Sequence, residues 1–154
     1  MDKKTTGILF GIGAGLSLAL LIRKLFLREA KEVHLTVRGV PGGGCEIQTP
    51  VADVELHKKH GDFVRWIISN PEDGGCGEIG ESVVVSVRNW KKNELPAPAP
   101  VFNVLGLARS VKRGGPSKTM VGTINPLVEE GGDFKYDVYI DEQNVLDPIV
   151  KLVL

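Results

Sequence analysis

The sequence predicts an all-β domain, an antiparallel β-sandwich of the Greek-key type, behind one N-terminal transmembrane α-helix. Three observations lead to this prediction. Residues 5–22 form an 18-residue run without a charge, short apolar or alternating segments follow it, and most of the 19 glycines and the 9 prolines punctuate those segments. Such punctuation is typical of strands joined by turns. We therefore divide the chain into an anchor with its flanks, residues 1–28, and a sandwich domain, residues 29–154.

The uncharged run has the length of a membrane span. As a helix, 18 residues extend about 27 Å, which matches the hydrocarbon core of a bilayer. Basic residues flank the run on both sides, and the following sequence RKLFLREAKEV offers no small-residue cleavage site of the kind that ends a secretory signal. We interpret the run as an uncleaved single-pass anchor rather than a signal peptide.

Small residues line one face of this expected helix. Gly7, Gly11 and Gly15 recur every four residues, and Ala19 continues the row. A stripe without bulky side chains lets a neighbouring helix approach closely, and close van der Waals contact drives helix association in lipid. These four residues are our candidate interface with an integral membrane partner, which is either a second copy of this chain or another protein.

The segments that follow show the patterns of strands. Residues 33–37 and 134–140 alternate strictly between apolar and polar side chains, as half-buried strands do. Seven to nine short strands are expected in all, the others being 45–49, 53–57, 62–69, 82–90, 101–108, 118–124 and 144–154. The Pro/Ala-rich stretch 95–101 is interpreted as an extended connection within the domain, because proline fixes φ and lacks a backbone donor.

Two segments resemble a known family. The strand Gly-Asp-x-Val-x-Trp at Gly61, Asp62, Val64 and Trp66 is similar to a signature of cupredoxins, the small copper-protein sandwiches. The segment 136–154, with its Asp-Pro turn before the last strand, is similar in layout to the end of the same fold. The resemblance covers residues 33–154 and implies a cupredoxin-like sandwich, although immunoglobulin-like sandwiches share much of the pattern. In such a core we expect Val64, Trp66, Tyr136 and Val138 to be buried.

The copper ligands of that family do not carry over. A blue-copper site needs two imidazoles and a thiolate, with a weak axial ligand. The resemblance places the family's cysteine at Val138, no His or Cys follows Cys76, and Met120 is the one methionine after Met1. We therefore expect no metal and no cofactor.

Cys45 and Cys76, the two cysteines of the chain, lie beside glycines in loop-like sequence. A disulfide between them fits an exported domain, because oxidising compartments let such bonds persist; two unrelated thiols are the alternative. The spacing to His57 and His60 lacks the paired Cys-x-x-Cys pattern of zinc sites. The cysteines and the resemblance favour the extracytoplasmic (periplasmic) side of the membrane, while the slightly more basic C-terminal flank of the anchor leaves the cytoplasmic side open.

Other chemistry finds little support in the sequence. With 19 basic and 19 acidic residues the chain has no net charge, which argues against nucleic acid as a partner. The segment RGGPSKT (113–119) lacks the glycine directly before the lysine and the following helix of a phosphate loop. Ser-His-acid sets, nucleophile elbows and paired carboxylates are missing from the sequence, and no small-molecule substrate is evident, so we expect no enzyme.

The function that these observations predict is a non-catalytic, single-pass membrane accessory subunit. Its glycine-striped helix would pack into a larger membrane complex, by analogy a respiratory or photosynthetic electron-transfer complex, and its sandwich would dock on a partner. One alternative is a membrane-tethered, cupredoxin-like electron carrier or metal-binding protein with an atypical site. Another is a free-standing adhesion or ligand-binding module that uses the loops opposite the anchor.

Overall fold

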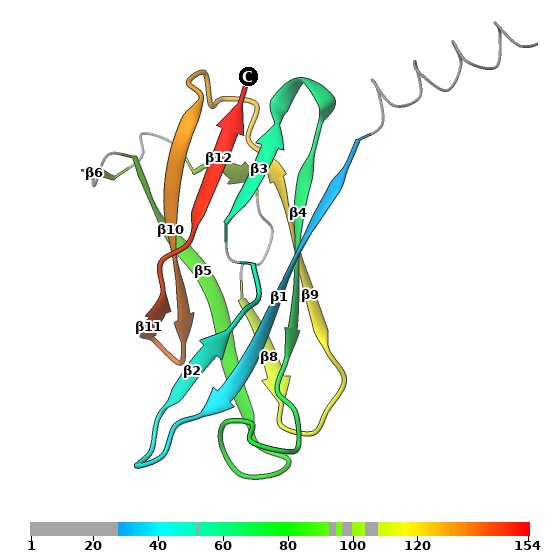
Figure 1. Cartoon of the computed structure of the whole chain (residues 1–154), viewed down its shortest axis with the longest axis vertical. Helices are drawn as coiled ribbons and strands as arrows, with labels where there is room; N and C mark the ends of the chain where they lie inside the picture. The colour runs from blue at the N-terminus through cyan, green and yellow to red at the C-terminus, as the bar shows by residue number, and fades with distance from the viewer. Residues whose placement is uncertain (1–27, 52, 93–94, 97–99, 104–107) are drawn as a thin grey trace, which may run out of the picture.

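The structure, a computed structural model of the 154-residue chain, describes residues 28–51, 53–92, 95–96, 100–103 and 108–154. These residues form two curled β-sheets that face one another (Figure 1). One sheet has the strand order β2-β1-β4-β9-β7. The other has the order β3-β12-β10-β5-β6, with β8 beside β5 and β11 beside β10. The prediction of an all-β sandwich is confirmed.

Twelve strands and one short 3-10 helix make up the described part of the chain. The elements are β1 (Ala30–Gly39), β2 (Cys45–Gln48), β3 (Val54–His57), η1 (Lys58–His60), β4 (Phe63–Ser69), β5 (Ser82–Lys92), β6 (Leu95–Pro96), β7 (Phe102–Asn103), β8 (Ala108–Lys112), β9 (Lys118–Ile124), β10 (Gly132–Ile140), β11 (Gln143–Leu146) and β12 (Ile149–Val153).

The predicted anchor and its stripe of Gly7, Gly11, Gly15 and Ala19 lie outside the described residues. Within the part of the chain that the structure does describe, no helix combines the length and the apolar character needed to cross a bilayer.

Two parallel strand pairs correct the prediction of a purely antiparallel sandwich. β1 pairs in parallel with β4, and β3 pairs in parallel with β12. Both follow from the path of the chain between β1 and β4. Residues 45–57 run back along the molecule but change sheets on the way: β2 pairs with β1, and after Pro50 the chain continues as β3 against β12. This long return lets β4 start at the same end as β1.

Two predicted strands are divided in the structure. The segment 101–108 supplies β7 to one sheet, where it pairs with β9, and the start of β8 to the other sheet, where it pairs with β5. The last segment is interrupted at Asp147 and Pro148, so that β11 and β12 pair separately with β10. A proline has no backbone N–H for a ladder, which accounts for the second division.

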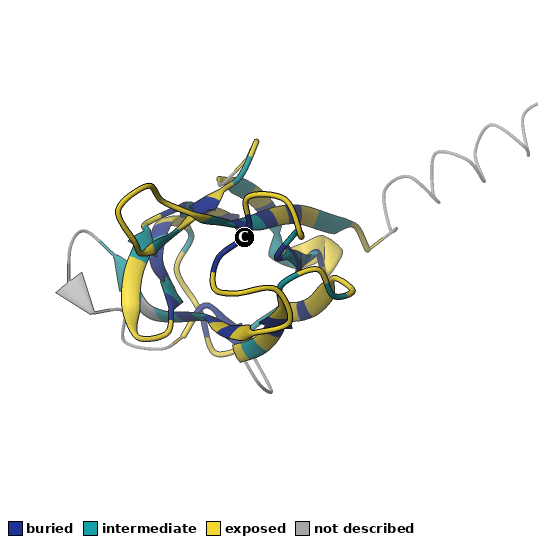
Figure 2. Ribbon diagram, turned by 90° about the horizontal axis from the view of Figure 1, so that it is seen from below, coloured by how far each residue is buried: buried dark blue, intermediate teal, exposed yellow. Residues whose placement is uncertain are grey.

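Alternating side chains fill the space between the sheets. Val33, Leu35 and Val37 of β1 are buried, as the period of two predicts, and Figure 2 shows the same alternation along other strands. On β10 the alternating residues Phe134, Tyr136, Val138 and Ile140 are all at most 3% exposed. The expected burial of this face is therefore confirmed.

Aromatic rings form the centre of the core. The fully buried Trp66 meets Phe102 and Tyr136 edge to face, at centroid distances of 5.4 and 6.0 Å, and its indole N–H donates to the Tyr136 hydroxyl at 3.2 Å. Gly122 on the neighbouring strand leaves room for the indole, since a Cβ there would lie 2.9 Å from two ring carbons. The partnered indole and hydroxyl can thus be buried without losing hydrogen bonds.

The two ends of the sandwich are built from different segments (Figure 1). The proximal end, at the top of Figure 1, contains Arg28, where the described chain begins, together with η1, the loop 125–131 and Leu154. The distal end, at the bottom, contains the loops 40–44, 70–81 and 113–117 and the β10–β11 turn. The parallel pairing of β1 with β4 decides this separation, because both strands start at the proximal end.

Candidate functional site

The longest connection at the distal end is the β4–β5 loop, residues 70–81. The structure joins its Cys76 to Cys45, at the start of β2, in a disulfide with the two Cα atoms 5.6 Å apart. A backbone hydrogen bond from Gly39 N–H to Gly74 C=O, 3.1 Å long, adds a second connection to the β1–β2 hairpin. The loop is therefore tied to the first sheet although it leads into the second.

Asn70 fixes the inside of this loop. Its side-chain amide donates to the Cys76 carbonyl at 3.0 Å, and its side-chain oxygen accepts from the Cys76 N–H at 2.9 Å, both within the buried interior. Gly75 passes so close to this amide that an added Cβ would collide with Asn70 Oδ1 and with the Pro71 carbonyl. Asparagine supplies both a donor and an acceptor, so this one side chain pairs with both backbone polar groups of Cys76.

Arg113, at the end of β8, holds the loop from outside. Its guanidinium donates twice to the Glu72 carbonyl, at 3.0 and 2.9 Å, and once to the Gly77 carbonyl. Its backbone N–H donates to the Glu81 carbonyl at 2.7 Å. Arg38 of β1 donates to the neighbouring Asp73 carbonyl at 2.6 Å. A guanidinium offers five donors in a fixed plane, which suits it to organise several carbonyls at once.

Ile79 lies in the turn between Glu78 and Glu81 of this loop and is 67% exposed. The turn is closed by the Glu81 N–H donating to the Glu78 carbonyl at 3.0 Å, while the Glu81 carboxylate accepts from the Glu78 N–H at 2.9 Å. A large apolar side chain is thus held in water by a loop that has little freedom to cover it. An exposed apolar residue on a pre-ordered support is a common feature of binding surfaces.

Charged side chains of both signs accompany the loop that carries Ile79. The loop contains Glu72, Asp73, Glu78 and Glu81, all exposed, and its sequence has no lysine or arginine. Three basic side chains from other elements lie against it: Arg38 and Arg113, which donate to its backbone carbonyls, and Lys112, which lies beside Gly80. The distal loop therefore presents one exposed apolar side chain among charges of both signs.

The residues considered above for a metal site lie in separate parts of the structure. Val138, where the resemblance puts the family's cysteine, is fully buried between the sheets, and so is Met120. His57 and His60 stack on one another at the proximal end, with ring centroids 5.0 Å apart, away from the cysteines. Among the residues that the structure describes, no three His, Cys, Asp or Glu side chains gather as a metal site.

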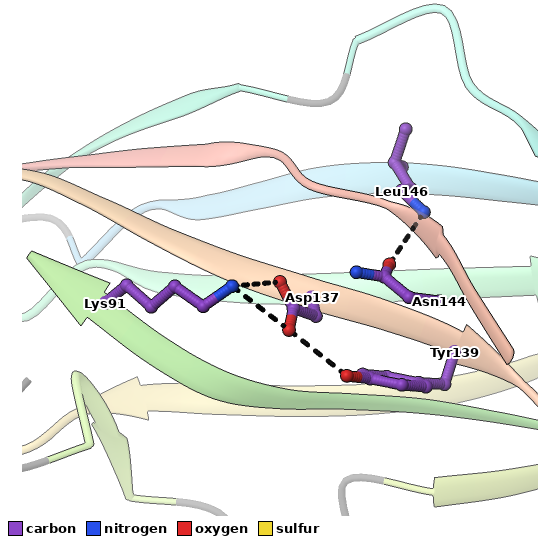
Figure 3. A network of polar contacts seen from close by, with 5 residues as sticks. All are labelled: Lys91, Asp137, Tyr139, Asn144 and Leu146. Carbon is purple, nitrogen blue, oxygen red and sulfur yellow. Dashed lines mark hydrogen bonds and ion pairs between the residues drawn. The ribbon is translucent and has the colours of Figure 1, made fainter. Parts of the chain in front are cut away.

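A second polar cluster lies between β5 and β10 (Figure 3). Asp137, only 2% exposed, accepts from the Lys91 ammonium at 3.1 and 3.4 Å and from the Tyr139 hydroxyl at 3.2 Å. The hydrogen bond with Asp137 and its charge raise the pKa of Lys91. Nearby, the Asn144 side chain accepts from the Leu146 N–H at 3.2 Å. A buried carboxylate needs such partners to remain charged. We therefore interpret this cluster as a structural ion pair between β5 and β10.

The sequence did not reveal most of these residues. Asn70, Arg113 and Ile79 each occur in segments that read as turns, and the contact between Arg113 and the loop joins residues about 40 positions apart. Asp137 lies in an alternating strand, where its position predicts an exposed side chain. The one usable signal was the pair of glycine-flanked cysteines, Cys45 and Cys76.

Two comparisons were made with known protein sequences. No model of a protein family matches the chain, and a search of curated proteins finds no match to its sequence. The functional argument therefore depends on the sequence and on the geometry described above.

Proposed function

We propose that this protein is a non-catalytic, single-pass membrane accessory subunit that docks the distal end of its sandwich on a partner protein. The observation that supports the proposal most directly is the β4–β5 loop. Its disulfide, the Asn70 amide and the Arg113 guanidinium order a surface from which Ile79 projects. The partner surface that fits it has an apolar pocket that accepts Ile79.

The membrane attachment in this proposal comes from the sequence. The 18 uncharged residues 5–22 have the length of a span, and the stripe of Gly7, Gly11, Gly15 and Ala19 is suited to contact with another membrane helix. The disulfide between Cys45 and Cys76 favours the extracytoplasmic side, because reducing compartments do not maintain such bonds.

We further propose that the sandwich is cupredoxin-like. The family resemblance rests on the strand at residues 61–66 and on the layout of the C-terminal segment. The two curled sheets that face one another are compatible with the same assignment. In this reading the fold is kept as a docking module, and the position of the family's cysteine is occupied by the core residue Val138.

The test is the size of the particle that contains this chain in gently solubilised native membranes. On a native gel we expect the wild-type chain to migrate in stoichiometric amount with a larger membrane complex. Ile79→Asp should release the chain from the complex, because docking would bury an unpaired aspartate charge in the interface. Val121→Asp is the matched control, since Val121 is an exposed valine in β9, away from the distal loop.

Gly11→Leu tests the second contact separately. A leucine in the glycine stripe should weaken the helix interface and reduce co-migration while the sandwich remains folded. Migration of the wild-type chain alone, as a monomer, would contradict the proposed function.

A further inference from the structure

We infer that the proximal end of the sandwich is itself a membrane-contact surface: Leu127 inserts into the bilayer interface while Arg28 and Lys59 face lipid phosphates. The inference rests on the proposed anchor, and it adds a second, independent contact between this protein and lipid.

Leu127 is the most exposed large apolar side chain in the described part of the chain, at 78%. It stands at the tip of the loop 125–131, which joins β9 to β10. Its neighbour Val128 is buried against the core, at 7%. These two neighbouring residues thus point in opposite directions: Val128 faces the core, and Leu127 faces away from it.

This loop is held in place, so the exposure of Leu127 is built into it. The Lys58 ammonium donates to the carbonyls of Pro126 and Val128, at 3.0 and 2.5 Å, on either side of Leu127. The Asn125 side chain accepts from the Leu127 N–H at 3.0 Å and donates to the Pro100 carbonyl at 2.9 Å. Because both flanks are fixed, Leu127 cannot fold back onto the sandwich without breaking these bonds.

The position of the chain brings the bilayer to this end. Arg28 begins the described chain at the proximal end and lies over the Phe63 ring, 4.8 Å from its centroid. Ile22, the last residue of the uncharged run, is only six residues earlier. Six residues span at most about 20 Å when fully extended, so a span at residues 5–22 leaves the proximal end close to the headgroups.

The charges of the proximal end fit lipid phosphates. An open hollow of about 280 Å³ lies there, with Arg28, Lys58 and Pro126 among its lining residues. Its one acidic lining residue, Asp62, is buried, and its oxygens accept from the N–H groups of Glu29 and His57 at 3.2 and 2.9 Å. Lys59 is exposed on η1.

Two of the exposed carboxylates of this end are in ion pairs. Glu29 pairs with Lys31 at 2.8 Å, and Glu130 pairs with Lys92 at 2.6 Å. Glu129, two residues after Leu127, and Asp133, at the start of β10, are exposed and oppose adsorption on an anionic surface. Arg28 and Lys59 therefore provide the attraction, and Leu127 provides the apolar contact.

The experiment uses the full chain reconstituted in vesicles of phosphatidylcholine and phosphatidylglycerol in a ratio of about three to one. The variant Leu127→Cys is labelled with the environment-sensitive dye NBD, while the native cysteines stay oxidised in their disulfide. Val84→Cys, an exposed position in β5 on the distal side, is the matched control. We expect blue-shifted emission and quenching by doxyl-labelled lipids at position 127, and neither at position 84. Arg28→Gln with Lys59→Gln should reduce the quenching at 127 about twofold.

Three other outcomes would overturn the inference, and each is distinguishable. If the protein floats with the vesicles but the label at 127 shows neither a blue shift nor quenching, the anchor stands and the contact of Leu127 with lipid is wrong. A blue shift at 127 without quenching by doxyl lipids would assign the surface to a protein partner or a second copy. A chain that does not float with the vesicles would remove the anchor, and with it both the proposed function and this inference.

Discussion

Side-chain contacts hold a loop at each end of this sandwich, but the contacts at the two ends differ in kind. At the distal end a covalent bond, Cys45–Cys76, is combined with the amide of Asn70 and the guanidinium of Arg113. At the proximal end the 125–131 loop depends on one flexible lysine, Lys58, and on Asn125. Each arrangement holds one large apolar side chain in the open.

The basic side chains of the two ends differ in what they contact. At the distal end, Arg38 and Arg113 donate to backbone carbonyls of the loop that carries Ile79. At the proximal end, which carries Leu127, Arg28 and Lys59 are exposed. One small domain can thus present two different contact surfaces along its long axis: the distal end suits an apolar pocket of a protein partner, and the proximal end suits a lipid surface.

The largest effect should come from the disulfide. Removing it by Cys45→Ala with Cys76→Ala should lower the free energy of unfolding by about 3 to 4 kcal/mol, because the bond closes a loop of 31 residues in the unfolded chain. Urea unfolding of the full chain in detergent measures this loss. Relative to the wild type, amide hydrogen exchange in this variant should become faster at residues 70–81 and stay the same in the 125–131 loop. An equal increase in both loops would contradict the idea that the disulfide holds the distal end alone.

Loss of the Asn70 side chain should have the next largest effect. Asn70→Ala leaves the buried N–H and C=O of Cys76 without partners, which should cost about 2 to 3 kcal/mol. The matched control is Asn144→Ala, where an exposed side chain accepts one hydrogen bond from Leu146 and the loss should stay below about 1 kcal/mol. If the two variants unfold at the same urea concentration, the distal loop does not depend on Asn70.

Tyr136 lies in the core that both ends share, and its titration should make the stability of the whole domain depend on pH. Burial raises the pKa of Tyr136 to about 12 from 10. The folded state therefore binds this proton more tightly than the unfolded state does. The resulting contribution to the free energy of unfolding is complete below pH 10 and is lost as the pH rises from 10 to 12. At pH 11.5 the free energy of unfolding should be roughly 2 kcal/mol lower than at pH 7 because of this group.

Tyr136→Phe should remove that alkaline loss, at a cost of about 1 kcal/mol at pH 7 for the missing hydrogen bond with Trp66. Urea unfolding at several pH values, with tyrosinate absorbance as the second readout, measures both effects. An unchanged slope of stability against pH above 10 would show that Tyr136 is not the group responsible.

The smallest effect is expected at the proximal end. Lys58→Met removes the donor that holds the carbonyls on either side of Leu127, and should lower stability by about 1 kcal/mol because these groups can still reach water. Hydrogen exchange should increase in the 125–131 loop alone. Faster exchange at residues 70–81 in this variant would mean that the two ends are not independent.

The general fold was predictable, and the reason lies in the periodicity. The alternation in β1 and β10 identified buried faces that the structure confirms, including Tyr136 and Val138. The sandwich follows from many short segments of this kind between glycine and proline turns. The parallel pairing of β1 with β4 was missed, because strand direction depends on where the chain changes sheets, and Pro50 alone does not show this.

The candidate surfaces were less predictable, because long-range contacts create them. Nothing near Arg113 in the sequence indicates that it binds carbonyls 36 and 41 residues away. Lys58 reads as part of a solvated hairpin, yet it reaches 68 and 70 residues along the chain. Asp137 shows the same limit: its alternating strand predicts an exposed position, whereas Lys91 and Tyr139 partner it in a buried one.

We propose above that the distal loop docks on a partner in the membrane-bound state. Amide hydrogen exchange of residues 70–81 measures this docking when the chain in its gently solubilised native assembly is compared with the purified chain. We expect these amides to be protected in the assembly and to lose that protection on purification, while exchange in β9 stays the same in both samples. Equal exchange of the loop in the two samples would show that the distal loop does not dock.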